Sequence, residues 1–289
     1  MAERPRLLNI AYRLVGSLSE AEDVVQETYA RWYALEPTER AAIVSPGAWL
    51  TRVASRICLD LLRSARSRRE RYVGEWIPEP VPDLAEWVGG MPRDGHDPAD
   101  RITLDESINM AFLVVLESMT PAERVAFILH DVFGFSFPEV AEIVGRSPAA
   151  CRQLASSARR RLRNGPPSAA APPRADAVRR FAQAWQAKDI PGLLRVLDPD
   201  ATVIADGGGL VSAELEPIAG AENIARYAVE LVGRIPNLSV LQRTVNGQPG
   251  LVLQADGETI AVLAIESVDG RITRIWTVRN PDKLRSWTT

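Results

Sequence analysis

The chain has 289 residues and is 46% apolar, which suits two or three modest domains with more than one hydrophobic core. It lacks both the roughly 20 uninterrupted apolar residues of a membrane helix and the apolar block of a signal peptide. These absences predict a cytoplasmic protein without a membrane span. Cys58 and Cys151 match no metal-ligand spacing, so we expect neither a metal nor another cofactor.

The net charge of −3 conceals a strong segregation along the chain. Residues 52–71 carry seven arginines against two acids, and residues 145–163 carry six arginines and no acid. Between them, residues 74–123 carry eleven acids against two arginines. Two basic segments separated by an acidic spacer indicate a nucleic-acid-binding protein rather than ordinary solvated helices.

The first third of the chain reads as helices. Apolar residues recur at three- and four-residue steps over 5–35, and Ser19 with Glu22 forms a capping-box pattern that predicts a second helix from about Glu20. We expect a loop over 36–46 and a third helix over 47–71. Residues 74–103 lose all periodicity and are rich in proline, glycine and acids, which predicts a linker.

Four further helices are predicted over 104–119, 121–132, 137–144 and 148–163, the second starting at Thr120-Pro121. A Pro/Ala-rich linker follows over 165–176. Residues 177–289 differ in kind. The predicted elements there are helices over 177–188, 190–197 and 220–233, and strands over 201–205, 238–245, 250–255, 259–267 and 271–279. An antiparallel meander with an Asp269-Gly270 hairpin turn predicts an α+β domain.

Residues 138–161 have the spacing of a helix-turn-helix. Ala141 allows close helix contact, Gly145 allows the turn, and Cys151 packs the second helix on the first. The second helix would expose side chains suited to base edges and phosphates in the major groove. They are Arg146, Ser147, Arg152, Gln153, Ser156, Arg159 and Arg160.

The helix over 47–71 combines Trp49 with a series of arginines. An aromatic ring that stacks on bases, next to cations that follow the backbone, is the pattern of proteins that bind separated strands. Trp49 taken alone is also compatible with ordinary core packing.

The order of these segments resembles an extracytoplasmic-function (ECF) RNA polymerase sigma factor. AEDVVQETYARW at 21–32 and SPGAWLTRVASRICLDLLRSARSRR at 45–69 resemble region 2, and the segment from LESMTPAERVAF through ARRRL within 104–163 resembles region 4. The implied domains are region 2 over 1–73, the linker over 74–103, region 4 over 104–164, the second linker over 165–176 and a regulatory domain over 177–289.

The resemblance implies roles for particular residues. Asp23, Gln26 and Glu27 match positions that contact core polymerase. The residues implied in reading and melting the minus-ten element are Trp49, Arg52, Arg56, Arg63 and Arg66, and region 4 is implied to read the minus-thirty-five element. Arg56 departs from the asparagine that many such factors carry.

The C-terminal part resembles the fused SnoaL-like extension of a sigma-factor subgroup, a conical α+β barrel that modulates activity in cis without a separate anti-sigma factor. The matching signatures are WIPEP, DGGG and NPDKL, that is Trp76, Pro78, Glu79, Pro80, Asp206, Gly207, Gly208, Gly209, Asn280, Pro281, Asp282, Lys283 and Leu284. Leu210 stands where the subgroup usually has a basic residue. Lys283 has two candidate acidic partners, Glu79 and Asp206, and we expect the barrel to hold the linker and restrain region 2 relative to region 4.

The alternatives are a helix-turn-helix repressor that binds DNA alone and a fused SnoaL-like isomerase or cyclase. The barrel domain has no histidine, so acid–base chemistry would fall to carboxylates or a tyrosine such as Tyr227. We therefore predict a non-enzymatic protein whose partners are core RNA polymerase and promoter DNA, with a small apolar molecule as a further candidate ligand of the cone.

Overall fold

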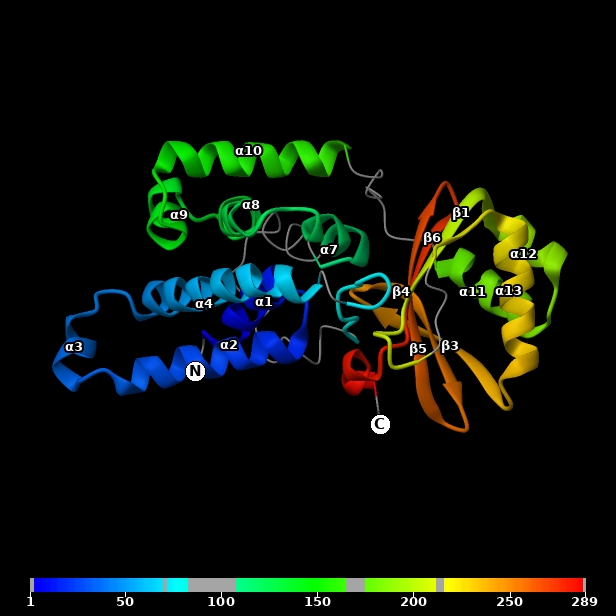
Figure 1. The fold of residues 1–289 in the computed structure, drawn as a ribbon. Helices are drawn as coiled ribbons and strands as arrows, with labels where there is room; N and C mark the ends of the chain where they lie inside the picture. Colours follow the sequence, from blue (N-terminus) through cyan, green and yellow to red (C-terminus); the bar gives the residue numbers. More distant parts are fainter. Residues whose placement is uncertain (1–2, 70–71, 83–107, 165–174, 212–215, 288–289) are drawn as a thin grey trace. The chain divides into compact units, whose positions relative to one another are not determined.

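The computed structural model in Figure 1 describes residues 3–69, 72–82, 108–164, 175–211 and 216–287. Within these ranges, the side chains of 65–69 and 164 are not described. The chain divides into two compact units: unit 1 holds residues 3–69, 108 and 112–164, and unit 2 holds 72–82, 109–111, 175–211 and 216–287. Most of the two predicted linkers, residues 83–103 and 165–174, lies outside the described residues.

The N-terminal part of unit 1 is helical. Its elements are α1 (Arg4–Val15), α2 (Leu18–Ala34), α3 (Pro37–Ala42) and α4 (Pro46–Arg69). The second helix begins earlier than predicted because Ser17, not Ser19, caps it and accepts a backbone N–H, while Gly16 ends α1 with a φ of 74°. The predicted loop over 36–46 is wrong in part, since a proline at the first helical position starts the short helix α3 there.

The second part of unit 1 contains α7 (Met110–Glu117, whose first two residues belong to unit 2), α8 (Pro121–Phe127), η1 (Ile128–Val132), α9 (Phe137–Val144) and α10 (Pro148–Asn164). Thr120 caps α8 as predicted, with Glu123 completing the capping box. The predicted helix over 104–119 begins only at Met110 within the described residues, because Ile108 and Asn109 are not helical. The predicted α-helix through residue 132 is wrong after Phe127, where the chain widens into a π-helical turn.

Unit 2 is built on one six-stranded sheet with the order β2-β1-β6-β5-β4-β3. The strands are β1 (Leu197–Asp206), β2 (Ile218–Ala219), β3 (Leu238–Val245), β4 (Gln248–Ala255), β5 (Glu258–Val268) and β6 (Arg271–Val278). The predicted meander and its last turn are confirmed for β3 to β6, and Asp269 and Gly270 have the positive φ values, 51° and 79°, of a tight hairpin. The first strand is not part of that meander, because β1 pairs in parallel with β6.

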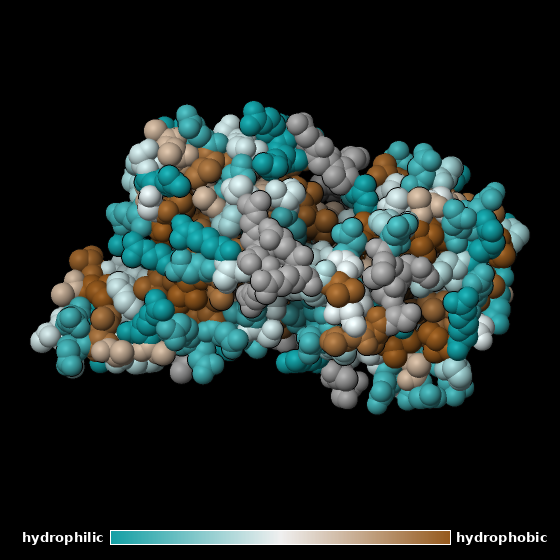
Figure 2. All heavy atoms as spheres, viewed as in Figure 1, coloured by the Kyte–Doolittle hydropathy of each residue, from teal (hydrophilic) through white to brown (hydrophobic). Residues whose placement is uncertain are grey.

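Three helices cover one face of this sheet: α11 (Ala175–Gln186), α12 (Ile190–Val196) and α13 (Ala221–Arg234). Phe181, Trp185 and Ile224 enter a core shared with strand residues such as Leu263. The opposite side of α13 is polar and exposed, as the teal spheres at the right of Figure 2 show. This amphipathic pattern explains why the helices pack on the sheet, and a cone with one helical wall results.

The predicted fold class is confirmed, since two helical parts precede an α+β domain of the barrel type. Two 3-10 turns, η2 (Pro281–Lys283) and η3 (Arg285–Trp287), follow β6. Across the part of the chain that the structure describes, every helix is too short or too polar to cross a bilayer.

Candidate nucleic-acid interface and linker clamp

The helix-turn-helix in unit 1 has the predicted construction. Gly145 ends α9 with a φ of 71° and donates its N–H to the Ala141 carbonyl. Cys151 is fully buried against the first helix, and burial raises the pKa of its thiol. A residue with a Cβ would be strained at Gly145, so the turn explains the glycine.

The predicted reading residues lie mostly on the solvent side of this motif. Those exposed are Arg146, Ser147, Arg152, Gln153, Ser156 and Arg160. Arg159 differs, because it is half-buried and pairs with Asp131 at 2.6 Å. Arg152 lies over the ring of Phe137, 5.1 Å from its centroid. The face therefore presents arginine, glutamine and serine side chains at the spacing of one helix.

The arginines of α4 whose side chains are described are exposed, but two of them already have partners within unit 1. Arg52 pairs with the Glu142 carboxylate of α9 at 2.5 Å, and Arg56 donates to the Glu142 carbonyl at 2.7 Å. Trp49 is half-buried and packs against Trp32, with ring centroids 5.2 Å apart. Trp49, which was predicted to stack on bases, is thus partly a core residue.

The remaining predicted residues of this part behave differently from one another. Arg63 pairs with Asp60 on its own helix at 3.2 Å, and the side chain of Arg66 lies outside the described residues. Asp23, Gln26 and Glu27 are all exposed on α2, as a protein-binding face requires.

A buried arginine that the sequence did not single out joins the two parts of unit 1. Arg124 of α8 donates to the Arg13 carbonyl at the end of α1 through Nε and Nη2, at 3.2 and 3.1 Å. Its Nη1 pairs with Glu117 at 2.7 Å, and burial lowers the pKa of the guanidinium to about 9. A cation is favourable at a helix C-terminus, where carbonyl groups lack helical partners.

In unit 2 the linker residues 72–82, which contain the WIPEP signature, are held by the other two signature segments around Lys283. Lys283 Nζ lies 2.7 Å from Asp206 Oδ2 and donates to the Ile77 carbonyl at 2.5 Å. It also lies over the Trp76 ring, 3.2 Å from its centroid. Of the two acidic partners considered from the sequence, Asp206 is the one bound in this way. We call this group of contacts the linker clamp.

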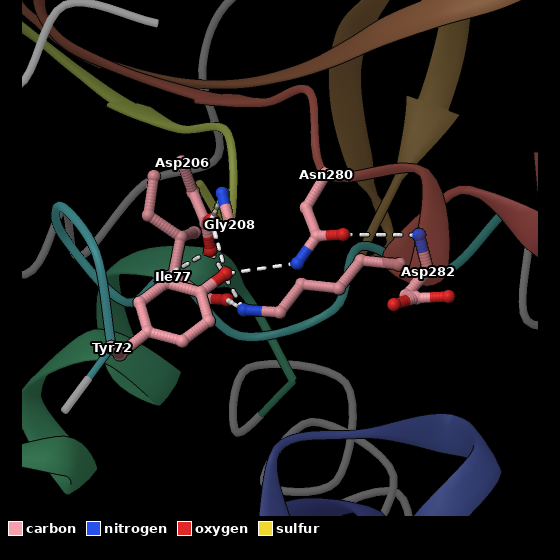
Figure 3. A network of polar contacts seen from close by, with 7 residues as sticks. Tyr72, Ile77, Asp206, Gly208, Asn280 and Asp282 are labelled. Carbon is pink, nitrogen blue, oxygen red and sulfur yellow. Dashed lines mark hydrogen bonds and ion pairs between the residues drawn. The ribbon is translucent and has the colours of Figure 1, made fainter. Parts of the chain in front are cut away.

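Asp206 occupies the centre of the linker clamp and is fully buried. Its Oδ2 accepts the Ile77 N–H at 3.0 Å, and its Oδ1 accepts the Tyr72 hydroxyl at 2.5 Å, as Figure 3 shows. The hydroxyl oxygen of Tyr72 accepts the Asn280 amide at 2.9 Å. Burial, reinforced by the hydrogen bond to Asp206, raises the pKa of Tyr72 and keeps it a donor.

The glycines bring the backbone of unit 2 close to the linker. Gly208 has a φ of 64° and donates to Asp206 Oδ1 at 3.0 Å, and a Cβ there would overlap the Asn280 amide. Gly209, with a φ of 71°, lies against Val73. Gly207 is buried, whereas Leu210 is 62% exposed.

A second set of contacts fixes the end of the same linker segment. Val81 exchanges two hydrogen bonds with Asn246, at 2.9 and 3.2 Å, and the Trp287 indole donates to the Pro80 carbonyl at 2.9 Å. Pro78, Glu79, Pro80 and Leu284 are buried, while Pro281 and Asp282 are exposed. Sequence reasoning missed Tyr72 and Asn246, although a buried asparagine in a hairpin turn is a polar residue that needs a partner.

Two family models match this chain: Sigma-70 region 2 over residues 1–68 and Sigma-70 region 4 over residues 109–162. With an exposed helix-turn-helix face and an arginine-rich helix, they define the class as a sigma-70-type subunit of RNA polymerase. The chain is 38% identical to the ECF RNA polymerase sigma factor SigJ of Mycobacterium tuberculosis over 295 residues, covering 98% of this chain and 91% of SigJ.

The chain is also similar to the crystal structure of M. tuberculosis SigJ, with a TM-score of 0.74 and 34% identity. This match covers 99% of this chain and 96% of the SigJ chain. The ECF RNA polymerase sigma factor SigG of the same species is 34% identical over 215 residues, covering 68% of this chain and 58% of SigG. The chain belongs to the ECF RNA polymerase sigma factors.

Family membership confirms the predicted function. The chain is a transcription factor that binds core RNA polymerase and directs it to promoters.

Proposed function

We propose that three surfaces of unit 1 divide the work of promoter recognition. The exposed carboxylates and amide of α2, Asp23, Gln26 and Glu27, bind core polymerase. Trp49 and the arginines of α4 act on the minus-ten element, and the exposed face of α10 reads the minus-thirty-five element. The observation that carries this assignment is the exposure of six of the seven predicted side chains on the helix-turn-helix face.

We also propose that unit 2 restrains the sigma regions in cis. The clamped segment starts at Tyr72, three residues after α4 ends at Arg69, so the clamp shortens the free length of chain between region 2 and region 4. A shorter tether raises the effective concentration of one region near the other. The clamp thereby favours the contact of Arg124 with α1.

Bringing region 2 and region 4 together has a direct consequence for DNA binding. Arg52 and Arg56 are held by Glu142, an acid on the first helix of the helix-turn-helix. Strand binding needs these cations for phosphates, so DNA and Glu142 compete for them. Binding to core polymerase selects the conformation in which the two regions have separated.

Run-off transcription with purified core polymerase tests both proposals. The full chain, a chain ending at Arg174, and the double variant Arg152→Glu/Arg160→Glu are compared on one promoter. The truncated chain should give more transcript, and the charge reversals should give almost none. Arg179→Glu, an exposed arginine of unit 2, serves as the matched control and should leave output unchanged. Equal output from full-length and truncated chains would contradict the restraint.

The barrel is proposed to be regulatory rather than catalytic. Its cavity is lined almost wholly by apolar side chains, with Arg279 as the one charged lining residue among those that the structure describes. None of the described lining residues is a carboxylate, so Tyr227 is the one acid–base candidate named from the sequence that lines the cavity. A clamp on the same chain also supplies restraint without a separate anti-sigma factor. If restraint of promoter output required the addition of a separate anti-sigma protein, this part of the proposal would be contradicted.

A further inference from the structure

The π-helical turn η1 presents two polar side chains to the helix-turn-helix. The His130 ring stacks with the ring of Phe137, the first residue of α9, with centroids 3.8 Å apart. The Asp131 carboxylate pairs with Arg159 of α10 at 2.6 Å. π-Helical turns are rare and are found frequently at functional sites. Both side chains of this turn contact the motif that is proposed to read DNA.

Phe137 connects the turn η1 to an exposed arginine of α10. The guanidinium of Arg152 lies over the Phe137 ring, 5.1 Å from its centroid. Local contacts fix both rings of the stack. His130 Nδ1 donates to the Phe135 carbonyl at 2.7 Å, and Ser136 caps α9 by accepting a backbone N–H. The segment 130–137 thus holds an aromatic surface in place for the guanidinium.

Two acids that precede the motif fix the rotation of α10 about its own axis. Glu123 of α8 accepts the Ser157 hydroxyl at 2.7 Å, and Asp131 binds Arg159. Rolling α10 would break both contacts. The acids therefore determine where the backbone of Arg152 lies, and the aromatic stack determines where its guanidinium lies.

Arg152 and Arg159 differ in what their contacts leave for DNA. The ion pair with Asp131 occupies donors of Arg159 that a base or phosphate would need. A ring contact is made with the cation and takes none of its N–H donors. Arg152 is exposed as well, so it can be held by the ring and still offer two parallel donors to a base.

Holding an arginine in place strengthens a base contact because less conformational entropy is lost on binding. Guanine presents O6 and N7, two acceptors that match the arginine fork in the major groove. We propose that Arg152 reads a guanine of the minus-thirty-five element and that Phe137 and His130 are positioning residues for it. This inference rests on the proposed assignment of the α10 face to that element.

Transcription from a promoter library tests the proposal, with the full chain, core polymerase and every base of the minus-thirty-five element randomised. The native chain should prefer guanine at one position. Arg152→Lys keeps the charge without the fork and should lower that preference about tenfold, as expected from losing one bidentate contact. Phe137→Leu should lower it several-fold at the same position, and His130→Leu somewhat less. Phe137→Tyr keeps a ring and should retain most of it.

A matched control separates positioning from stability. Phe112→Leu makes the same substitution in a phenylalanine of α7 that pairs with Phe127, and it should lower transcription evenly across all bases. The double variant Arg152→Lys/Phe137→Leu should prefer guanine no less than Arg152→Lys alone, because the ring acts through the arginine.

Two results would overturn the inference. An even loss across all bases in Phe137→Leu, like that in Phe112→Leu, would exclude positioning by the ring. An unchanged guanine preference in Arg152→Lys would exclude this arginine as the reader. Failure of the α10 assignment itself is a different result, since Arg152→Glu/Arg160→Glu would then leave transcription intact.

Discussion

The two units of this sigma factor each use one buried cation to hold a distant segment of chain by a backbone carbonyl. Arg124 binds the Arg13 carbonyl and the Glu117 carboxylate, and Lys283 binds the Ile77 carbonyl and the Asp206 carboxylate. A backbone carbonyl carries no charge of its own. The carboxylate offsets the cost of burying the cation, and the carbonyl determines which segment is held.

The ion pair of the linker clamp differs in exposure from an ion pair between the two parts of unit 1. The pair of Arg52 with Glu142 leaves the side chains 44% and 54% exposed. In the linker clamp, the side chains of Lys283 and Asp206 are 6% and 0% exposed, and aromatic rings cover them. Salt screens exposed pairs but not buried ones. The exposed pair of Arg52 with Glu142 is thus suited to exchange with DNA phosphates, while the buried pair of the clamp is suited to persist until a specific event releases it.

Removing the cation of the clamp should have the largest effect. Lys283→Met leaves Asp206 buried without its charge partner, and we expect unit 2 to lose about 3–5 kcal/mol of unfolding free energy. Chemical denaturation of the full chain, followed by tryptophan fluorescence, measures the loss. Asp206→Asn with Lys283→Met removes both charges and should recover part of it.

A second substitution of Lys283 separates the effect of its positive charge from the effect of its side-chain shape. Lys283→Arg keeps the charge, but a planar guanidinium does not reproduce an ammonium that donates to a carbonyl while lying over the Trp76 ring. We expect the unfolding free energy of this variant to lie between that of the native chain and that of Lys283→Met. Full stability in Lys283→Arg would mean that charge alone holds the linker.

Removing the cation of unit 1 should have a smaller effect. Glu117 is 14% exposed, so after Arg124→Met it keeps some contact with water, and we expect a loss of about 1.5–3 kcal/mol. The expected specific result is a larger distance between regions 2 and 4, measured by resonance energy transfer between labels on α2 and α10. An unchanged distance would show that Arg124 stabilises region 4 only.

The exposed pair should contribute least among the ionic contacts. Glu142→Gln removes the carboxylate that binds Arg52 but keeps the carbonyl that binds Arg56, and exposed pairs are worth less than about 1 kcal/mol. We expect tighter binding to a single-stranded minus-ten oligonucleotide at low salt, with the gain lost at high salt. A gain that persists at high salt would contradict a screened, competing pair.

Acidic pH should slightly destabilise region 4 around the first turn of α9. The pKa of Glu139 is lowered by hydrogen bonds from the Ser136 side chain and backbone, with Arg52 nearby. Its folded pKa is below its unfolded one, so its stabilisation is present above the unfolded pKa and is lost as the pH falls through the folded pKa. Denaturation of Glu139→Gln at several acidic pH values should show a shallower dependence on pH than the native chain.

Much of unit 1 was predictable because its signals are local. Spacing in the helix-turn-helix fixes which side chains face out, and Thr120 caps its helix through contacts within three residues. Arg124 was not predictable, since its partner is the backbone carbonyl of residue 13, which leaves no pattern in side-chain identity.

In unit 2 the sequence indicated the clamp but not its arrangement. The three signatures named Asp206 and Lys283, yet the choice between Glu79 and Asp206 depended on the register between β1 and β6. That parallel pairing links strands far apart in the chain and was not predicted. Tyr72 and Asn246 enter the site for the same reason, because each contacts a segment more than 100 residues away.

Hydrogen exchange at the Ile77 amide, measured in the free chain and in the complex with core polymerase, tests the central claim most directly. The restraint predicts strong protection in the free chain, where this N–H is buried on Asp206, and a large loss of protection once polymerase is bound. Equal protection in both states would mean that the clamp stays closed during initiation, and would contradict the account.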